Sequence, residues 1–219
     1  MSESEQTLQV VLVDDQELIR TAVESYLSEV GIDVVGRARD GEEAMRMVAE
    51  TSPDVVVMDL GLPGESGIEV TSRLATVAPL TKVLVLTGSV EQHDVLDAIL
   101  AGASGYLLKD ASREQIVDAV RAAAAGESVI SPKIAGRLLD RIRGREDVPD
   151  QAAAIRLVLT DREYEVLTQL AAGKDNPQIA RELFISPKTV KNHIASILAK
   201  LQVENRIQAA IRAVRSGVV

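Results

Sequence analysis

Residues 8–125 show short apolar runs that alternate with longer amphipathic stretches. Apolar runs of a few residues, rich in Val and Leu, are typical of strands buried on both faces, whereas apolar residues three or four positions apart are typical of helices. The predicted strands are Val10–Val13, Ile32–Val35, Val55–Met58, Val83–Leu86 and Tyr106–Leu108.

A helical pattern follows each of these runs. Strand and helix alternate throughout the region, which predicts an α/β fold: a doubly wound five-stranded parallel sheet with helices on both faces. The predicted helices cover residues 16–29, 41–50, 67–77, 91–101 and 112–125.

The last third of the chain has helical patterns throughout. At three places a residue that typically caps a helix is followed by a Pro at the next position or by a Glu three positions later, and both are favoured in the first turn of a helix. Gly173 and Gly217 are typical residues at which helices end. The helices are short, and a tight "LFIS" connection joins the second to the third, which is typical of a helix-turn-helix motif. The three starts are Thr160 with Glu163, Asn176 with Pro177, and Ser186 with Pro187.

A polar stretch separates these two patterned parts. Ser131 and Pro132 favour the start of a short helix. Residues 144–155 are rich in Gly, Pro and charged residues, as linkers are. We therefore predict a first domain over residues 1–128, a linker with a short helix over residues 129–156, and a helical domain over residues 157–219.

Charge divides the chain in the same region. Residues 1–150 carry 14 Lys and Arg against 27 Asp and Glu, a net charge of −13, whereas residues 151–219 carry 10 against 6, a net charge of +4. An acidic module is therefore joined to a mildly basic one. The absence of Cys excludes disulfides, thiolate metal sites and Cys nucleophiles. No apolar run reaches the roughly 18 residues of a membrane span, and we expect a cytoplasmic protein.

Charged or polar residues follow four of the five apolar runs. The first run ends in Asp14 and Asp15, the third in Asp59, the fourth in Thr87 and the fifth in Lys109. The carboxyl ends of the strands of an open parallel sheet lie along one edge, where ligands bind. We therefore predict that three carboxylates, one hydroxyl and one ammonium converge there. A lone Asp pair would more often be a helix-capping turn.

Three close carboxylates need positive charge, because at least one of them would otherwise take up a proton. A hard divalent cation with oxygen ligands supplies that charge. Mg²⁺ fits best, since it keeps several waters and accepts one or two carboxylates together with phosphate oxygens. A site with Mg²⁺, a Lys, a hydroxyl and one projecting carboxylate is suited to hold a phosphoryl group on that carboxylate.

Four motifs of this region, "VDD", "VVVMDLGLPGESG", "VLVLTGS" and "GYLLKD", resemble the receiver domain of two-component response regulators. The resemblance covers about residues 8–125 and implies a flavodoxin-like fold with Asp59 as the phosphoacceptor. It also implies that Asp15 and Asp59 bind Mg²⁺ directly, and Asp14 through water. The family uses an aromatic residue at the position of Tyr106 as a rotating switch; the alternative is that Tyr106 simply packs in the core. The remaining implied roles are the backbone carbonyl of Gly61 as a metal ligand, Thr87 and Lys109 as partners of the phosphoryl group, and Tyr106 as the rotating switch.

The third predicted helix of the basic module has two different faces. At 100° per residue, one stripe is apolar, and the opposite face combines polar with small residues. Lys suits phosphate or guanine, Asn suits adenine, and small residues let the helix backbone approach DNA in the major groove. An ordinary amphipathic helix with a solvated polar face is the alternative. The apolar stripe is Val190, Ile194, Ile197 and Leu201, and the opposite face carries Lys188, Asn192, Ala195, Ser196 and Ala199, with Lys191 on its flank.

The segment that runs from "LTDREYEVL" to "ISPKTVKNHIASILAKL" closely resembles LuxR-type DNA-binding domains, over about residues 157–217. Pro177 is a minor departure from the family pattern that leaves the fold expectation unchanged. The resemblance implies a surface for double-stranded DNA with inverted-repeat half-sites. The last helix carries an apolar stripe that is either domain core or, as in the family, the dimer contact. The implied DNA-facing residues are Lys188, Thr189, Lys191, Asn192 and Ala195, and the stripe consists of Ile207, Ala210, Ile211 and Val214.

Together these features are similar to the NarL/FixJ class of response regulators, which are phosphorylation-controlled transcription factors rather than enzymes. The expected partners are a sensor histidine kinase and DNA, with a homodimer on phosphorylation and no membrane contact. A hydrolase of the haloacid dehalogenase type needs a second Asp where this chain has Gly61. A ligand-gated LuxR-type sensor needs more aromatic residues than one Phe and three Tyr. A receiver used only as an interaction surface would not need the intact Asp, Thr and Lys set.

Overall fold

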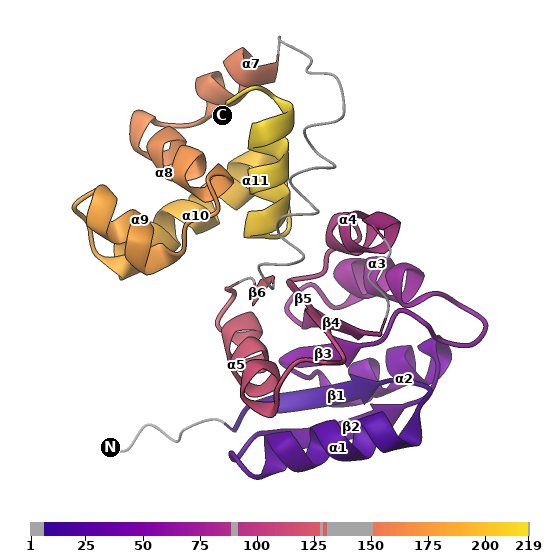
Figure 1. Cartoon of the computed structure of the whole chain (residues 1–219). Coiled ribbons are helices and arrows are strands. Elements are labelled where there is room, and N and C mark those ends of the chain that lie inside the picture. The colour runs from indigo at the N-terminus through magenta and orange to yellow at the C-terminus, as the bar shows by residue number, and fades with distance from the viewer. Residues whose placement is uncertain (1–6, 89–91, 128, 131–150, 219) are drawn as a thin grey trace. The chain divides into compact units, whose positions relative to one another are not determined.

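The structure is a computed structural model that describes residues 7–88, 92–127, 129–130 and 151–218. The chain separates into an N-terminal unit, residues 1–135, and a C-terminal unit, residues 136–219 (Figure 1). Each unit is described by itself. Within the described ranges, no helix is both long and apolar enough to cross a bilayer.

The N-terminal unit is built on a fully parallel sheet with the strand order β2-β1-β3-β4-β5-β6. Strands rich in Val and Leu occupy its centre and are buried on both faces, so the predicted α/β fold with a parallel sheet is confirmed. The strands are β1 (Gln9–Val13), β2 (Asp33–Ala38), β3 (Val55–Met58), β4 (Lys82–Thr87), β5 (Gly105–Leu108) and β6 (Val129–Ile130).

Two strands differ from the prediction. β6 is a sixth strand, in which Val129 and Ile130 pair with β5 at the edge of the sheet. Two residues are too few to produce a periodic signal, so the sequence pattern assigns them to the linker. β2 runs on to Ala38 because it is an edge strand that pairs with β1 alone, and such a strand tolerates polar residues. Its Arg37 binds the carboxylate of Glu24 on the first helix at 2.9 Å.

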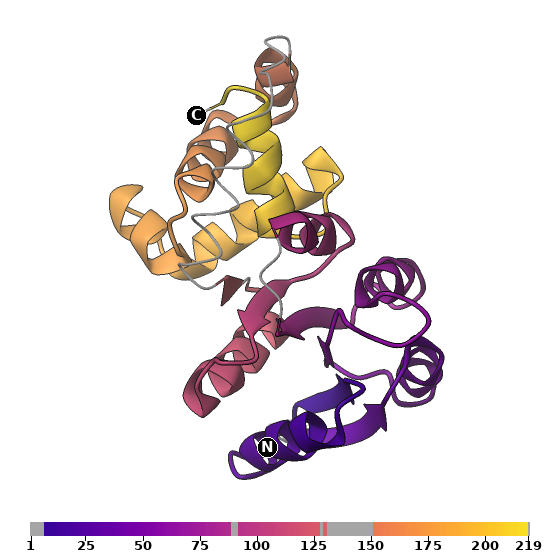
Figure 2. The same cartoon turned by 45° about the vertical axis from the view of Figure 1, so that its right-hand side comes forward.

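Five helices cover the two faces of the sheet at the predicted positions. One core cluster packs α1 and α5 against one face, and another packs α2 and α3 against the other, as Figures 1 and 2 show. Helices on both faces of a parallel sheet make the predicted doubly wound arrangement. The helices are α1 (Glu17–Ser28), α2 (Gly41–Thr51), α3 (Gly67–Val77), α4 (Gln92–Leu100) and α5 (Arg113–Ala124).

The C-terminal unit is helical and has a core of its own. Its first helix was not expected, because residues 151–156 fall within the predicted linker 129–156. Ile155 is buried in the core of this unit and anchors that helix, so the linker prediction is wrong for these residues. The short helix predicted after Ser131 lies outside the described residues. The helices are α7 (Gln151–Val158), α8 (Asp161–Ala171), α9 (Asn176–Glu182), α10 (Pro187–Leu201) and α11 (Arg206–Arg215).

Side-chain caps start α8, α9, α10 and α11. Thr160 forms the predicted capping box with Glu163, and Ser186 accepts a hydrogen bond from the backbone N–H of Thr189 at 3.0 Å. The predicted cap Asn176 is wrong by one residue. Asp175 caps α9, since its extended backbone lets its carboxylate accept from the N–H of Gln178. The Asn176 amide oxygen instead accepts from Arg206 at 2.9 Å.

Candidate functional site

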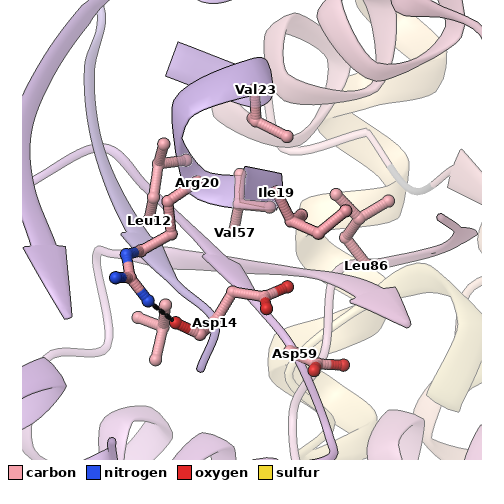
Figure 3. A pocket seen from close by; sticks show the side chains of 9 residues that line it. Leu12, Asp14, Ile19, Arg20, Val23, Val57, Asp59 and Leu86 are labelled. Carbon is pink, nitrogen blue, oxygen red and sulfur yellow. Dashed lines mark hydrogen bonds between the residues drawn. The ribbon is translucent and has the colours of Figure 1, made fainter. Parts of the chain in front are cut away.

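Three carboxylates meet at the carboxyl edge of the parallel sheet. Asp14 follows β1, and Asp59 follows β3, the neighbouring strand in which Met58 pairs with Val13. One oxygen from each of Asp14, Asp15 and Asp59 lies within 4.8 Å of the others. Figure 3 shows Asp14 and Asp59 at the ends of their strands. The structure therefore brings together the three acidic residues that strand-end position predicted.

Lys109 completes this cluster from the end of β5. Its Nζ lies 2.6 Å from Oδ2 of Asp14 and 2.9 Å from Oδ2 of Asp59. Its backbone N–H donates to the carbonyl of Thr87 at 2.9 Å, which ties the ends of β4 and β5 together. Asp59 is held at its other oxygen, because the N–H of Leu60 donates to Oδ1 at 2.8 Å. One ammonium thus bridges two buried carboxylates.

The charges of this cluster influence one another. Burial raises the pKa of the Asp14 carboxyl, although hydrogen bonds from Lys109 and from the N–H of Gln16 act against that rise. Burial also disfavours the charged form of Lys109, but its hydrogen bonds to Asp14 and Asp59 outweigh this and raise the pKa of the ammonium. The lysine is therefore charged at neutral pH, and three carboxylates face one cation. Their oxygen-only donor set fits a hard divalent cation such as Mg²⁺.

An open cleft of about 320 Å³ lies over Asp59. Besides Asp15, Asp59 and Lys109, its lining includes Gly61 and Thr87, both of which sequence analysis had placed at the site. Ser66 also lines the cleft, although sequence analysis did not select it. The signal was present, because Ser66 is followed three residues later by Glu69 and forms a capping box at the start of α3.

A glycine allows α3 to begin close to Asp59. A Cβ at Gly67 would lie 2.0 Å from the backbone oxygen of Asp59, which no side chain permits. The N–H of Gly67 donates to the carbonyl of Leu60 at 3.1 Å. The first turn of α3 is therefore held against the loop that follows β3, and Ser66 and Ile68 reach the cleft from it.

Thr87 and Tyr106 lie on the same face of the sheet. Their strand neighbours Leu86 and Leu107 belong to the core cluster beneath α1 and α5. Since successive side chains of a strand alternate between faces, Thr87 and Tyr106 point to the opposite face. β4 and β5 are paired in parallel, with Thr87 opposite Leu108, and both predicted residues are buried.

Arg20 is a further residue that sequence analysis missed. Its guanidinium on α1 donates to the backbone carbonyl of Asp14 (Figure 3) and to the carboxylate of Glu17. A cavity of about 10 Å³, the size of one water, lies between Arg20, Asp14 and Asp59. Arg20 thereby holds the turn that carries Asp14 and Asp15, and only the tertiary structure brings α1 back over that turn.

The exposed face of α10 has the predicted composition. Its apolar stripe, Val190, Ile194, Ile197 and Leu201, is buried in the core of the C-terminal unit. Thr189 is half-buried, with its hydroxyl 2.8 Å from that of Ser186. The prediction is wrong for Ser196. This residue is half-buried, and its hydroxyl donates to Glu163 on α8 at 2.5 Å. The exposed side chains are Lys188, Lys191, Asn192, Ala195 and Ala199.

Glu163 joins the start of α8 to the second half of α10. Its residue surface is only 5% exposed, and it accepts from Ser196, from Lys200 at 2.7 Å and from the backbone N–H of Thr160 at 2.7 Å. Burial opposes its charge, but the hydrogen bonds from Lys200, Ser196 and Thr160 outweigh this and lower its pKa to about 2. The carboxylate is thus a fixed link between the two helices.

The apolar residues of α11 divide between two sides of the helix. Ala209 and Ala213 belong to the core cluster of the C-terminal unit, and Val214 packs at its margin. The other three residues of the predicted stripe, Ile207, Ala210 and Ile211, are not part of that cluster. Ile207 and Ile211 are nevertheless buried, and Ala210 and Val214 are half-buried, so no residue of the predicted stripe is exposed.

Comparisons with known proteins match both units. Residues 10–121 match the family model of the response regulator receiver domain, and residues 157–213 match that of bacterial regulatory proteins of the luxR family. The chain is 42% identical to the transcriptional regulatory protein LiaR of Bacillus subtilis, over 97% of this chain and 99% of LiaR. It is 38% identical to the response regulator protein VraR of Staphylococcus aureus, over 97% and 99% of the two chains.

Solved structures give the same result. The response regulator ChrA of a heme-sensing two-component system is 36% identical, with a TM-score of 0.53 over 97% of this chain and 99% of ChrA. The receiver domain of the putative response regulator NarL from Mycobacterium tuberculosis is 36% identical, with a TM-score of 0.54 over 56% of this chain and 99% of that domain. The similarity therefore extends through both units.

Proposed function

Because the chain belongs to the response regulators of two-component systems, with a receiver domain followed by a LuxR-type DNA-binding domain, we propose that Asp59 accepts a phosphoryl group from a histidine kinase and so controls DNA binding. The observation that carries the proposal is the position of Asp59. Its carboxylate follows β3, lies 2.9 Å from the Lys109 ammonium, and lines an open cleft with Asp15, Gly61 and Thr87.

The transfer proposed here is a substitution at phosphorus. An oxygen of Asp59 forms the new P–O bond while the P–N bond to the kinase histidine breaks, and the electron pair goes to the leaving imidazole nitrogen, which takes up a proton. Lys109 stays beside the acceptor and offsets the charge on the phosphoryl oxygens. Asp15, Asp59 and the carbonyl of Gly61 would hold Mg²⁺, and Asp14 would hold it through water. Bound there, the ion would neutralise phosphoryl charge.

The phosphoryl group would act on the rest of the receiver through Thr87. We propose that the Thr87 hydroxyl moves toward the new oxygens and that Tyr106 takes the space it leaves. Support for this comes from the strand geometry, since both side chains point to the same face of the sheet. The surface that they change would then pair two receiver domains.

In the DNA-binding domain, α10 is proposed to enter the major groove. Asn192 would read a base, Lys188 and Lys191 would meet phosphates, and the small side chains of Thr189 and Ala195 would allow close approach. The stripe of α11 would join two copies on inverted-repeat half-sites. Its members are Ile207, Ala210, Ile211 and Val214.

Phosphorylation of the full chain tests the assignment of Asp59. Treatment with a small phosphodonor and Mg²⁺ should add one phosphoryl group by mass to the wild type and none to Asp59→Asn. Asp110→Asn is the matched control, because Asp110 is exposed and lies next to Lys109 in the sequence. A phosphoryl group on Asp59→Asn would contradict the proposal.

A further inference from the structure

The turn between α9 and α10 carries an aromatic side chain in a costly conformation. Phe184 is the single Phe of the chain, and 93% of its surface is exposed. Its φ of 54° lies in the left-handed region, which bulky residues rarely adopt. The side chain therefore gains no burial that would compensate for the strained backbone.

The turn does not need a Phe at this position. The N–H of Ile185 donates to the carbonyl of Ala180 at 3.0 Å, and the N–H of Phe184 donates to that of Arg181 at 3.4 Å. This is the pattern in which a helix ends at a left-handed residue, and that residue is usually Gly. The guanidinium of Arg162 on α8 also holds the turn, by donating to the carbonyl of Leu183. Gly at position 184 would keep these bonds and remove the strain.

The position of Phe184 favours DNA as its partner. It lies two residues before Ser186, the cap of α10. In a helix-turn-helix motif the recognition helix contacts bases with its first residues while the preceding helix crosses the backbone, so the turn between them passes along the phosphates. The side chains of Arg181 and Lys188 on either side of the turn are exposed, and their charge complements that of phosphate.

We propose that the ring of Phe184 packs against the deoxyribose–phosphate backbone at the edge of the major groove and so positions α10 on the duplex. The inference rests on the proposed entry of α10 into that groove. Deoxyribose offers an apolar C–H surface to an aromatic ring, while the two cations beside it hold neighbouring phosphates. Because backbone contacts carry no sequence information, Phe184 contributes equally on every sequence.

The test compares three variants of the full-length protein, each treated with a small phosphodonor and Mg²⁺. They are Phe184→Gly, Phe184→Tyr and the control Gln202→Gly. Gln202 ends α10 with a φ of 52° and is exposed, so the control removes the same kind of strain away from the turn. DNA affinity is measured with a labelled duplex of random sequence and with one that the wild type selects from a random library, and each protein is melted.

Both Gly variants should have a Tm a few degrees above that of the wild type, because a left-handed non-Gly residue is removed. Phe184→Gly should nevertheless bind both duplexes about 5–20-fold more weakly, as expected for losing the burial of part of a ring. Phe184→Tyr and Gln202→Gly should bind as the wild type does. Stability and affinity then change in opposite directions in Phe184→Gly alone.

Unchanged DNA affinity in Phe184→Gly would overturn the inference. The exposed ring would then be assigned to contact with a protein partner instead of DNA. A loss confined to the selected duplex would overturn it too, because the contact would then be to a base. Failure of the wild type itself to bind either duplex would instead overturn the proposed function, on which the inference rests.

Discussion

Three carboxylates lie close together at the edge of the sheet, and their surroundings differ. Asp14 and Asp59 are buried and hydrogen-bonded to Lys109, whereas Asp15 is exposed at the mouth of the cleft. A cation that approaches from solvent therefore meets Asp15 first. Removing the Lys109 ammonium would lower the stability of the fold more than removing the Asp15 carboxylate would. Without Lys109, the buried carboxylates of Asp14 and Asp59 would be left unpaired.

Asp15→Asn should weaken Mg²⁺ binding by about 10–100-fold or more, because a charged oxygen ligand becomes a neutral amide. Mg²⁺-dependent phosphorylation of Asp59 should be lost with it. Calorimetric titration of wild type, Asp15→Asn and the control Asp110→Asn measures the effect. Equal Mg²⁺ affinity in all three proteins would show that the metal site is assigned to the wrong residues.

Glu163 gives the C-terminal unit a defined acid sensitivity. Its pKa falls from 4.5 to about 2, so the ionised carboxylate contributes stability that is fully present above pH 4.5 and is lost as the pH falls toward 2. Glu163→Gln should lower stability at neutral pH by about 1–3 kcal/mol, since Lys200 loses its charged acceptor. Thermal melts of both proteins between pH 7 and pH 2 should converge at the acid end. If the difference in Tm between wild type and Glu163→Gln stayed the same at all pH values, this role of Glu163 would be refuted.

At the scale of elements, α10 is oriented by polar links from other helices. Glu163 on α8 holds its second half, and Arg212 on α11 donates to the carbonyl of Leu201 at its end. Another arginine of α11, Arg206, links that helix to the segment before α9, since it donates to the carbonyl of Lys174. Much of the basic charge of this domain therefore stabilises its own structure, and the exposed face of α10 carries the residues that we propose to meet DNA.

Asn192→Ala should lose about 1–3 kcal/mol of discrimination at one position of each half-site, because a side chain that reads a base is removed. Lys188→Ala should weaken all sequences alike and reduce the slope of affinity against salt by about one charge. Selection from a random library and salt titrations separate the two effects. A uniform loss in Asn192→Ala would reverse the two roles.

At the scale of the whole molecule, an acidic receiver is joined to a basic DNA-binding domain, with net charges of −13 and +4 on residues 1–150 and 151–219. Each unit has a core of its own, so each can act as a folded module. An acidic module that competes with DNA for a basic one provides a means of control. A coupling of about 1–3 kcal/mol between sites changes affinity roughly 5- to 150-fold.

Phosphorylation should therefore tighten the binding of wild type to one DNA site within that range and produce a dimer. Asp59→Asn should bind weakly with or without phosphodonor, and the isolated fragment 151–219 should bind without it. DNA titrations combined with light scattering measure both effects. If the fragment bound no better than the unphosphorylated full chain, covering of the basic domain by the receiver would be excluded, and dimerisation alone would account for control.

The sequence by itself determined what depends on neighbours along the chain. Hydrophobic periodicity located the five main strands and the described helices other than α7, because side chains alternate or recur at fixed intervals within each element. Capping at Thr160 and Ser186 depends on residues three positions away. The strand-end residues Asp59, Thr87 and Lys109 were also predictable, since parallel strands place all their carboxyl ends at one edge of the sheet.

Only the tertiary structure decided which distant groups meet. Ser196 has a polar side chain on a helix surface, but its partner Glu163 is 33 residues away. Asn176 binds Arg206 across 30 residues, and Ile155 is buried because α7 packs onto the helical core. The same local sequence pattern allows a side chain at the margin of a helix to face either solvent or a neighbouring element. The packing of one element against another settles that choice, and no periodicity records it.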